Sequence, residues 1–95
     1  MTQKTFAERL REDRRLVLLR LLFEQIGYRA NSSILHAGLD YLAVACSRDD
    51  VLTDLAWLRD QALVRLIETV PGVQVAELSA RGMAIVPGVS RPSPK

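Results

Sequence analysis

Apolar side chains recur near the start of the chain at the spacing of an α-helix. They fall on one narrow stripe at 100° per residue: Phe6, Leu10, Val17 and Leu21. Thr5 followed by Glu8 is typical of a capping box, in which each residue satisfies a free backbone N–H of the other. Gly27 suits the left-handed position that ends a helix. The pattern predicts a first helix over about residues 5–26.

Two shorter helices are predicted next. Asn31, Ser32 and Ser33 each offer an N-cap, and three leucines follow at i, i+4 and i+7: Leu35, Leu39 and Leu42. Ser47 is a second N-cap, and an apolar face follows it at spacings of four, three and four: Val51, Leu55, Leu58 and Ala62. We therefore predict helices over 32–44 and 48–62. The very short link near residues 45–46 favours a helix-turn-helix.

The pattern of residues changes after residue 62, where branched apolar side chains predominate. Pro71-Gly72 is typical of a type II turn, so residues 64–70 and 73–78 are predicted to form a β-hairpin. Ser79 caps a last short helix, predicted over 80–86 and stopped by Pro87. The fold class is therefore mostly α with a β-hairpin. Residues 1–86 make one domain, and residues 87–95 an extended tail that holds prolines and basic residues.

Composition limits the possible classes of protein. The 95 residues suffice for a single domain, and 48% hydrophobic with 25% charged residues is typical of a globular chain. The single cysteine excludes an internal disulfide framework. Arg20 and Glu24 interrupt the longest apolar stretch, which predicts no membrane span and no membrane partner. We expect a cytoplasmic protein.

Two short motifs carry a resemblance to a known fold family. Residues 55–64, LAWLRDQALV, resemble the end of a winged-helix recognition helix as it enters the first wing strand. Residues 77–82, ELSARG, resemble the L-[ST]-x-x-G turn after the second strand. Over its whole length, including the P-G-V-x-R-P-S-P-[RK] pattern of residues 87–95, the chain is similar to small winged-helix proteins of transposable Mu-like phages and prophages. Members of that family are often described as ArsR-like.

The resemblance implies a winged helix-turn-helix of three helices, a two-stranded wing and a short C-terminal helix. It also implies DNA binding in transcriptional control within a bacterial host cell. One position departs from the pattern, because winged helices often have glycine where this chain has Ala62. A left-handed alanine costs about 1–2 kcal/mol, so we expect the third helix to end differently or to run on through Leu63.

The candidate chemistry is sparse. An ArsR likeness implies metal sensing, but His36 and Cys46 are the only soft candidate ligands and lie ten positions apart. A glycine-rich phosphate loop and a G-x-S-x-G elbow are both absent from the sequence. We therefore predict no metal site, no cofactor and no enzymatic activity.

The charge pattern argues against the usual mode of DNA binding. Residues 47–62 carry two basic and four acidic side chains, a balance of −2, and helical rotation turns Asp49, Thr53, Trp57 and Asp60 outward. Residues 68–74, the wing tip, hold no Lys or Arg. Residues 1–30 carry seven basic and four acidic side chains, a balance of +3. These arginines form either a solvated helix face or a phosphate-binding patch together with the tail. The candidate DNA contacts are Arg11, Arg14, Arg15, Arg48, Thr53, Arg91 and Lys95.

A protein interface is the alternative. Residues 16–23 are apolar on nearly every face, so this segment either runs through the centre of the domain or meets another chain. We predict a homodimer with the first helix in the interface, and Leu18 and Leu22 as candidate contacts. Trp57 either packs inside the domain or anchors an interface. The alternative function is therefore a winged-helix adaptor for a phage or host protein, with little or no DNA affinity.

Overall fold

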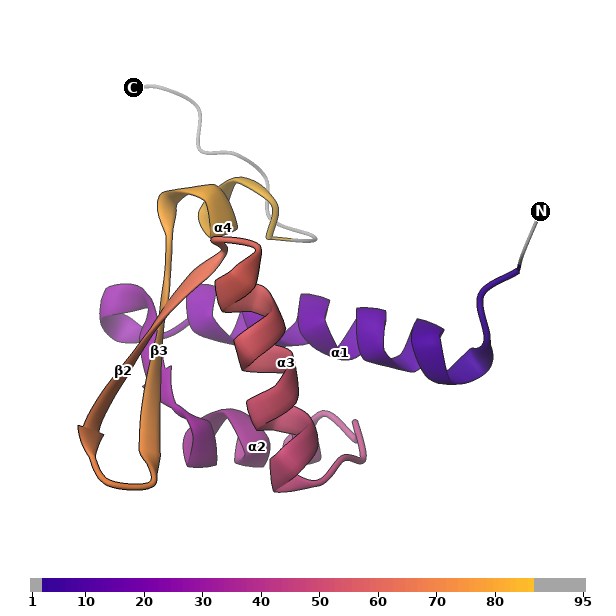
Figure 1. Cartoon of the computed structure of the whole chain (residues 1–95), viewed down its shortest axis with the longest axis horizontal. Helices are drawn as coiled ribbons and strands as arrows, with labels where there is room; N and C mark the ends of the chain where they lie inside the picture. Colours follow the sequence, from indigo (N-terminus) through magenta and orange to yellow (C-terminus); the bar gives the residue numbers. More distant parts are fainter. Residues whose placement is uncertain (1–2, 87–95) are drawn as a thin grey trace.

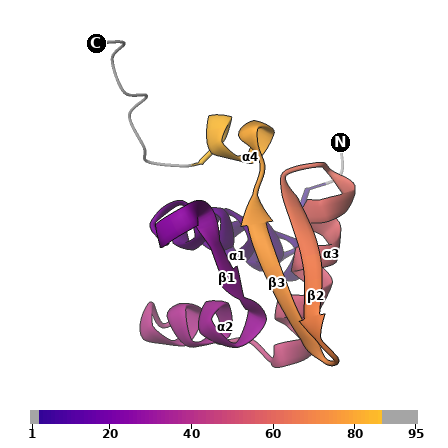
Figure 2. The same ribbon diagram turned by 90° about the vertical axis from the view of Figure 1, so that its left-hand side faces the viewer.

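A computed structural model describes residues 3–86, which form four α-helices and a three-stranded antiparallel sheet (Figure 1). In chain order the elements are α1 (Phe6–Phe23), the 3-10 turn η1 (Ile26–Tyr28), β1 (Arg29–Asn31), α2 (Ser32–Tyr41), α3 (Arg48–Asp60), β2 (Val64–Val70), β3 (Val73–Leu78) and α4 (Ala80–Ala84). The three longer helices pack against one face of the sheet, α4 lies beyond the end of β3, and the β2–β3 hairpin extends beside α3 (Figure 2). This arrangement is a winged helix-turn-helix, which confirms the predicted fold class.

The predicted capping box sets the start of α1. The backbone N–H of Glu8 donates to the Thr5 hydroxyl at 3.1 Å, and the Glu8 carboxylate accepts from the Thr5 N–H at 3.4 Å. The predicted end at residue 26 is wrong, because α1 ends at Phe23. Gly27 does adopt a left-handed backbone, with φ of 74°, but inside η1 rather than directly after the helix.

The two helices of the helix-turn-helix also begin at predicted caps, and of the three candidates before the second helix it is Asn31 that caps it. The Asn31 side chain accepts from the N–H of Ile34 at 2.8 Å, and Ser47 forms a capping box with Asp50. The predicted end of the second helix at residue 44 is wrong. Helix α2 ends at Tyr41, because the chain turns away through a left-handed residue shortly after it.

The end of α3 corrects two further predictions. Ala62 itself adopts the left-handed conformation, with φ of 61°, while Leu63 donates its N–H to Leu58 O and Ala62 donates to Arg59 O. This pair of hydrogen bonds is a Schellman motif, so the helix ends at Asp60 in the usual way despite lacking glycine. Ala62 is also exposed rather than part of the inner face. Leu63, the next residue, is buried in its place.

The sheet contains the predicted hairpin and one unpredicted strand. The strands β2 and β3 occupy the predicted residues, and Gly72 takes φ of 82° in the turn between them. The additional strand β1 pairs with β3 through Arg29 opposite Glu77 and Asn31 opposite Val75, which gives the order β1-β3-β2 (Figure 2). A strand of three residues is too short to show an alternating pattern in the sequence.

The ELSARG motif joins the last helix to the end of α3. Ser79 donates its backbone N–H to Leu63 O at 3.0 Å and its hydroxyl to Ala62 O at 2.7 Å. The same hydroxyl accepts from the N–H of Gly82 at 3.0 Å and so caps α4. Gly82 packs so closely that a Cβ atom there would lie 2.2 Å from Leu63 O. The helix ends at Ala84, two residues before the predicted end.

The core is built mainly of leucines from all three longer helices. Leu18 and Leu22 on α1 are fully buried within this single chain, where they pack with leucines of α2 and α3 and with Ala76 of the sheet. Their predicted place in a protein interface is therefore wrong, because the domain itself covers them. The apolar half of α1 is the central helix of the domain (Figure 1). Within residues 3–86 no helix is long and apolar enough to cross a membrane.

Candidate nucleic-acid interface

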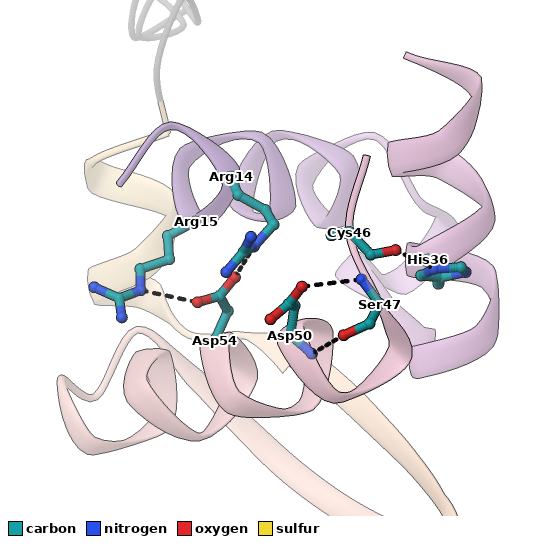
Figure 3. Close-up of polar contacts among 7 residues, drawn as sticks. All are labelled: Arg14, Arg15, His36, Cys46, Ser47, Asp50 and Asp54. Carbon is teal, nitrogen blue, oxygen red and sulfur yellow. Dashed lines mark hydrogen bonds and ion pairs between the residues drawn. The ribbon is translucent and has the colours of Figure 1, made fainter. Parts of the chain in front are cut away.

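A buried carboxylate joins the first helix to the third. Asp54 on α3 is completely buried and accepts hydrogen bonds from Arg14 and from Arg15, whose Nε lies 3.2 Å from Oδ1 (Figure 3). The hydrogen bond to Asp54 raises the pKa of the Arg14 guanidinium. The two helices are thus held together by paired charges as well as by leucine packing.

This arrangement corrects the predicted phosphate-binding patch. Arg14 is only 8% exposed and Arg15 is largely covered, and both direct their guanidinium groups at Asp54 rather than at solvent. Arg15 also lies over the Trp57 ring, with its Cζ 4.1 Å from the ring centroid. Both arginines therefore connect α1 with α3 and do not form an open basic surface.

The position of Asp54 in the sequence indicates that its carboxylate is buried, which a count of charges along the helix does not show. Asp54 lies three residues after Val51 and four before Leu58, so it falls on the same helical stripe as the apolar inner face. A carboxylate on a buried stripe needs a buried cationic partner. The spacing alone could not show that Arg14 and Arg15, some forty residues earlier in the chain, supply it.

Trp57 combines the two roles that the sequence left open. One part of its ring packs beneath Arg15, yet the side chain remains 40% exposed. It lines a groove of about 320 Å³ between α1 and α3, together with Leu16, Leu58 and Ile85. The indole therefore belongs to the domain packing and also forms part of the surface.

The start of α2, the outer face of α3 and the turn of the wing meet on one surface. Arg48 donates from Nη2 to the Ser33 hydroxyl at 3.0 Å, which holds the guanidinium beside the start of α2. A shallow depression next to it is lined by Ser32, Arg48, Leu52 and Gly72. Thr53 is exposed, as its predicted outward position requires, and Arg48 is exposed as well.

The remaining charges on α3 balance more evenly than the sequence suggested. With Asp54 inside the domain, the other charged side chains of the helix are Arg48 and Arg59 against Asp49, Asp50 and Asp60. Arg59 pairs with Asp60 at 3.2 Å. The hydrogen bond from the Ser47 backbone lowers the pKa of Asp50, which keeps that carboxylate charged as a cap. The outer face remains weakly acidic.

The other predicted residues lie apart from this surface or outside the structure. His36 donates from Nε2 to the Cys46 carbonyl at 3.0 Å and so ties α2 to the turn before α3 (Figure 3). Burial raises the pKa of the Cys46 thiol. Between residues 3 and 86 no three His, Cys, Asp or Glu side chains gather as a metal site. Arg11 is exposed on α1, whereas Arg91 and Lys95 lie outside the described residues.

Several solved structures share this architecture. The chain matches hsRosR-S1, in a structure described as a complex, with a TM-score of 0.66 and 16% identity over 76% of this chain. It spans 62% of hsRosR-S1, less than two thirds.

Two MarR family transcriptional regulators of Streptomyces coelicolor also match over 88% of this chain. Sco3205, solved in complex with DNA, has a TM-score of 0.61 and 19% identity over 67% of its chain. AbsC has a TM-score of 0.59 and 17% identity over 71% of its chain. At such identities the likeness shows the fold.

Sequence relatives are closer. No protein-family model matches the chain. An uncharacterized protein of Haemophilus influenzae is 43% identical over 77 residues, which cover 81% of this chain and 74% of the relative. The uncharacterized protein gp26 of Escherichia phage Mu is 41% identical over 92 residues, which cover 90% of this chain and 94% of gp26. The chain therefore belongs to the same protein family as gp26 of phage Mu and this Haemophilus protein.

Proposed function

We propose that this protein is a phage or prophage transcriptional regulator that binds DNA through its winged helix-turn-helix. The observation that carries the proposal is the shared surface of α2, α3 and the wing, with Arg48 held by Ser33 beside the start of α2. The fold likeness to Sco3205, which was solved with DNA, supports it. The proposed regulator is not an enzyme, and it acts in the cytoplasm of a bacterial host.

The proposed contacts are mostly to phosphates. Arg48 and the positive N-terminal end of α2 lie together, and both attract a DNA phosphate. Thr53 on the exposed face of α3 is placed to reach base edges in the major groove. Arg11, Arg91 and Lys95 remain proposed contacts to the flanking backbone. Arg14 and Arg15 are left out, because Asp54 already engages them.

A substitution series tests this surface. Arg48→Ala should weaken binding to mixed-sequence duplexes severalfold in a fluorescence anisotropy titration at low salt, because it removes a phosphate contact. Arg81→Ala is the matched control, since it removes an exposed arginine from α4, at the opposite end of the hairpin from the wing turn (Figure 1). An equal loss of DNA affinity in the two variants would contradict the proposed surface, because it would show that overall charge alone attracts the duplex.

The exposed indole supports a second candidate function. Trp57 is 40% exposed beside an apolar groove and next to a weakly acidic helix face, which suits an adaptor for a phage or host protein. Under this alternative the natural chain binds little or no DNA, and Arg48→Ala does not change that. Trp57→Ala then abolishes capture of the partner in a pull-down, while Arg48→Ala does not. Duplex binding by the natural chain at low salt would favour the regulator instead.

A further inference from the structure

The first two turns of α1 extend beyond the body of the domain (Figure 1). Arg14 is the first buried residue of the helix, so residues 6–13 pack against little of the described chain. Phe6 is 75% exposed and Leu10 is 48% exposed along this segment. A helix of two turns is marginal in water on its own, and it gains stability when its apolar stripe is covered.

An apolar groove continues from this stripe. Leu10 and Val17 of α1 line a groove of about 400 Å³ together with Ala43, Val44 and Ala45 of the turn between α2 and α3. The stripe and the groove thus form one continuous surface, which we call the α1 surface. Its apolar part is large enough to receive an aromatic side chain such as that of Phe6.

Charged side chains of both signs border the stripe, so this surface is complementary in charge to a second copy of itself. Arg9 and Asp13 both border it, and neither forms an ion pair within residues 3–86. If two α1 helices pack antiparallel around a two-fold axis between residues 11 and 12, Phe6 of each copy faces Val17 of the other. Arg9 of each copy then lies within reach of Asp13 of the other, because the rise is 1.5 Å per residue.

We propose that the α1 surface is the contact between two copies of this chain. Each copy places Phe6 in the groove of the other, and two reciprocal Arg9–Asp13 ion pairs border the apolar contact. A second copy fits better than an unrelated protein because one stripe supplies both the apolar projection and its groove, and both signs of charge. The contact lies apart from the shared surface of α2, α3 and the wing, and it does not depend on the DNA proposal.

The proposed dimer contact lies nearer the start of α1 than the contact expected from the sequence. Leu18 and Leu22 are enclosed by their own domain, so they are unavailable to a partner. Phe6 and Leu10 lie on the same helix but outside the packed region, and both are open to solvent. The dimer therefore needs the projecting end of α1, Val17 and the turn before α3.

Sedimentation equilibrium of the full chain tests the contact directly. We expect a dimer at about 100 µM protein and a dissociation constant raised about tenfold or more by Phe6→Ala. Ile26→Ala is the matched control, because Ile26 is 99% exposed on η1 and lies outside the groove. A natural chain that stays monomeric at about 100 µM would overturn the proposal, and so would equal effects of the two substitutions.

A charge exchange distinguishes the proposed pairing from a general apolar contact. Arg9→Asp and Asp13→Arg should each weaken the dimer, because each creates a repulsive pair across the axis. The double variant restores opposite charges at both places and should recover most of the dimer. Circular dichroism checks that every variant keeps its helix content. A double variant as weak as the two single variants would overturn the antiparallel arrangement.

Discussion

Arg14 and Asp54 form an ion pair inside the domain, where the first helix crosses the third (Figure 3). Asp54 has no exposed surface, and Arg15 donates to its second oxygen. A buried charge of this kind is stable only while its partners remain in place. The pairing fixes α3 against α1, and α3 is the helix that contributes most of the surface proposed for DNA.

Removing the buried carboxylate should therefore destabilise the domain strongly. Asp54→Ala leaves Arg14 buried without its anion, and breaking such a pair typically costs about 3–5 kcal/mol in the free energy of unfolding. Urea denaturation followed by circular dichroism measures the change. Asp60→Ala is the control, because Asp60 is exposed and its loss should cost less than about 0.5 kcal/mol. Similar losses in both variants would contradict the assigned role of Asp54.

The left-handed alanine at the end of α3 offers a stabilising substitution. Ala62 has φ of 61°, a conformation that glycine adopts without the steric cost that alanine bears. We expect Ala62→Gly to raise the free energy of unfolding by about 1 kcal/mol. Ala37→Gly, on the exposed side of α2, should instead lower it by roughly 0.5–1 kcal/mol. Thermal unfolding of the two variants would show shifts in opposite directions, and a loss of stability in Ala62→Gly would contradict this reading.

Gly82 should tolerate no larger residue. Its Cβ would lie 2.2 Å from the Leu63 carbonyl oxygen, which belongs to the backbone and cannot move without disturbing the start of β2. We expect Gly82→Ala to destabilise the domain by about 2–3 kcal/mol. Gly38→Ala meets only the end of the flexible Leu21 side chain, at 3.0 Å, and should cost less. Chemical denaturation compares them, and an unaffected Gly82→Ala would contradict the close packing of α4.

The cap of α3 should make stability depend on pH. The folded pKa of Asp50 is lowered, because the Ser47 N–H donates to its carboxylate. Its contribution to stability is therefore present above the unfolded pKa, about 3.9, and is lost as the pH falls through the folded value. Between about pH 6 and pH 3 the natural chain should lose more stability than Asp50→Asn does. If the natural chain and Asp50→Asn lose the same stability as the pH falls, the Asp50 carboxylate makes no such contribution.

Local signals in the sequence predicted much of this fold. Thr5, Ser47 and Ser79 cap helices as expected, and Asn31 is the one of three candidates that caps α2, because a cap depends only on residues within three positions of it. The Pro71-Gly72 turn placed both strands of the wing for the same reason. Helix ends were less predictable. The left-handed residues that follow α2 and α3 are alanines, which carry no such signal.

The site was harder to predict than the fold, because its contacts are distant along the chain. Arg14 and Arg15 resemble a solvated basic patch in the sequence, and only the packing of α1 on α3 turns them toward Asp54. Strand β1 is likewise defined by its pairing with β3, about forty-five residues further along the chain. The sequence offered Arg48 as a candidate DNA contact, but not the hydrogen bond by which Ser33 holds it beside the start of α2.

The salt dependence of duplex binding tests the central claim most directly. Anisotropy titrations of the natural chain with a mixed-sequence duplex, over a series of salt concentrations, give the number of phosphate contacts from the slope of log affinity against log salt, about −0.9 per contact. We expect binding at about 50 mM salt, a steep negative slope, and a slope shallower by about 0.9 in Arg48→Ala. No binding at about 50 mM salt would contradict the account and leave the protein adaptor as the better explanation of this winged helix.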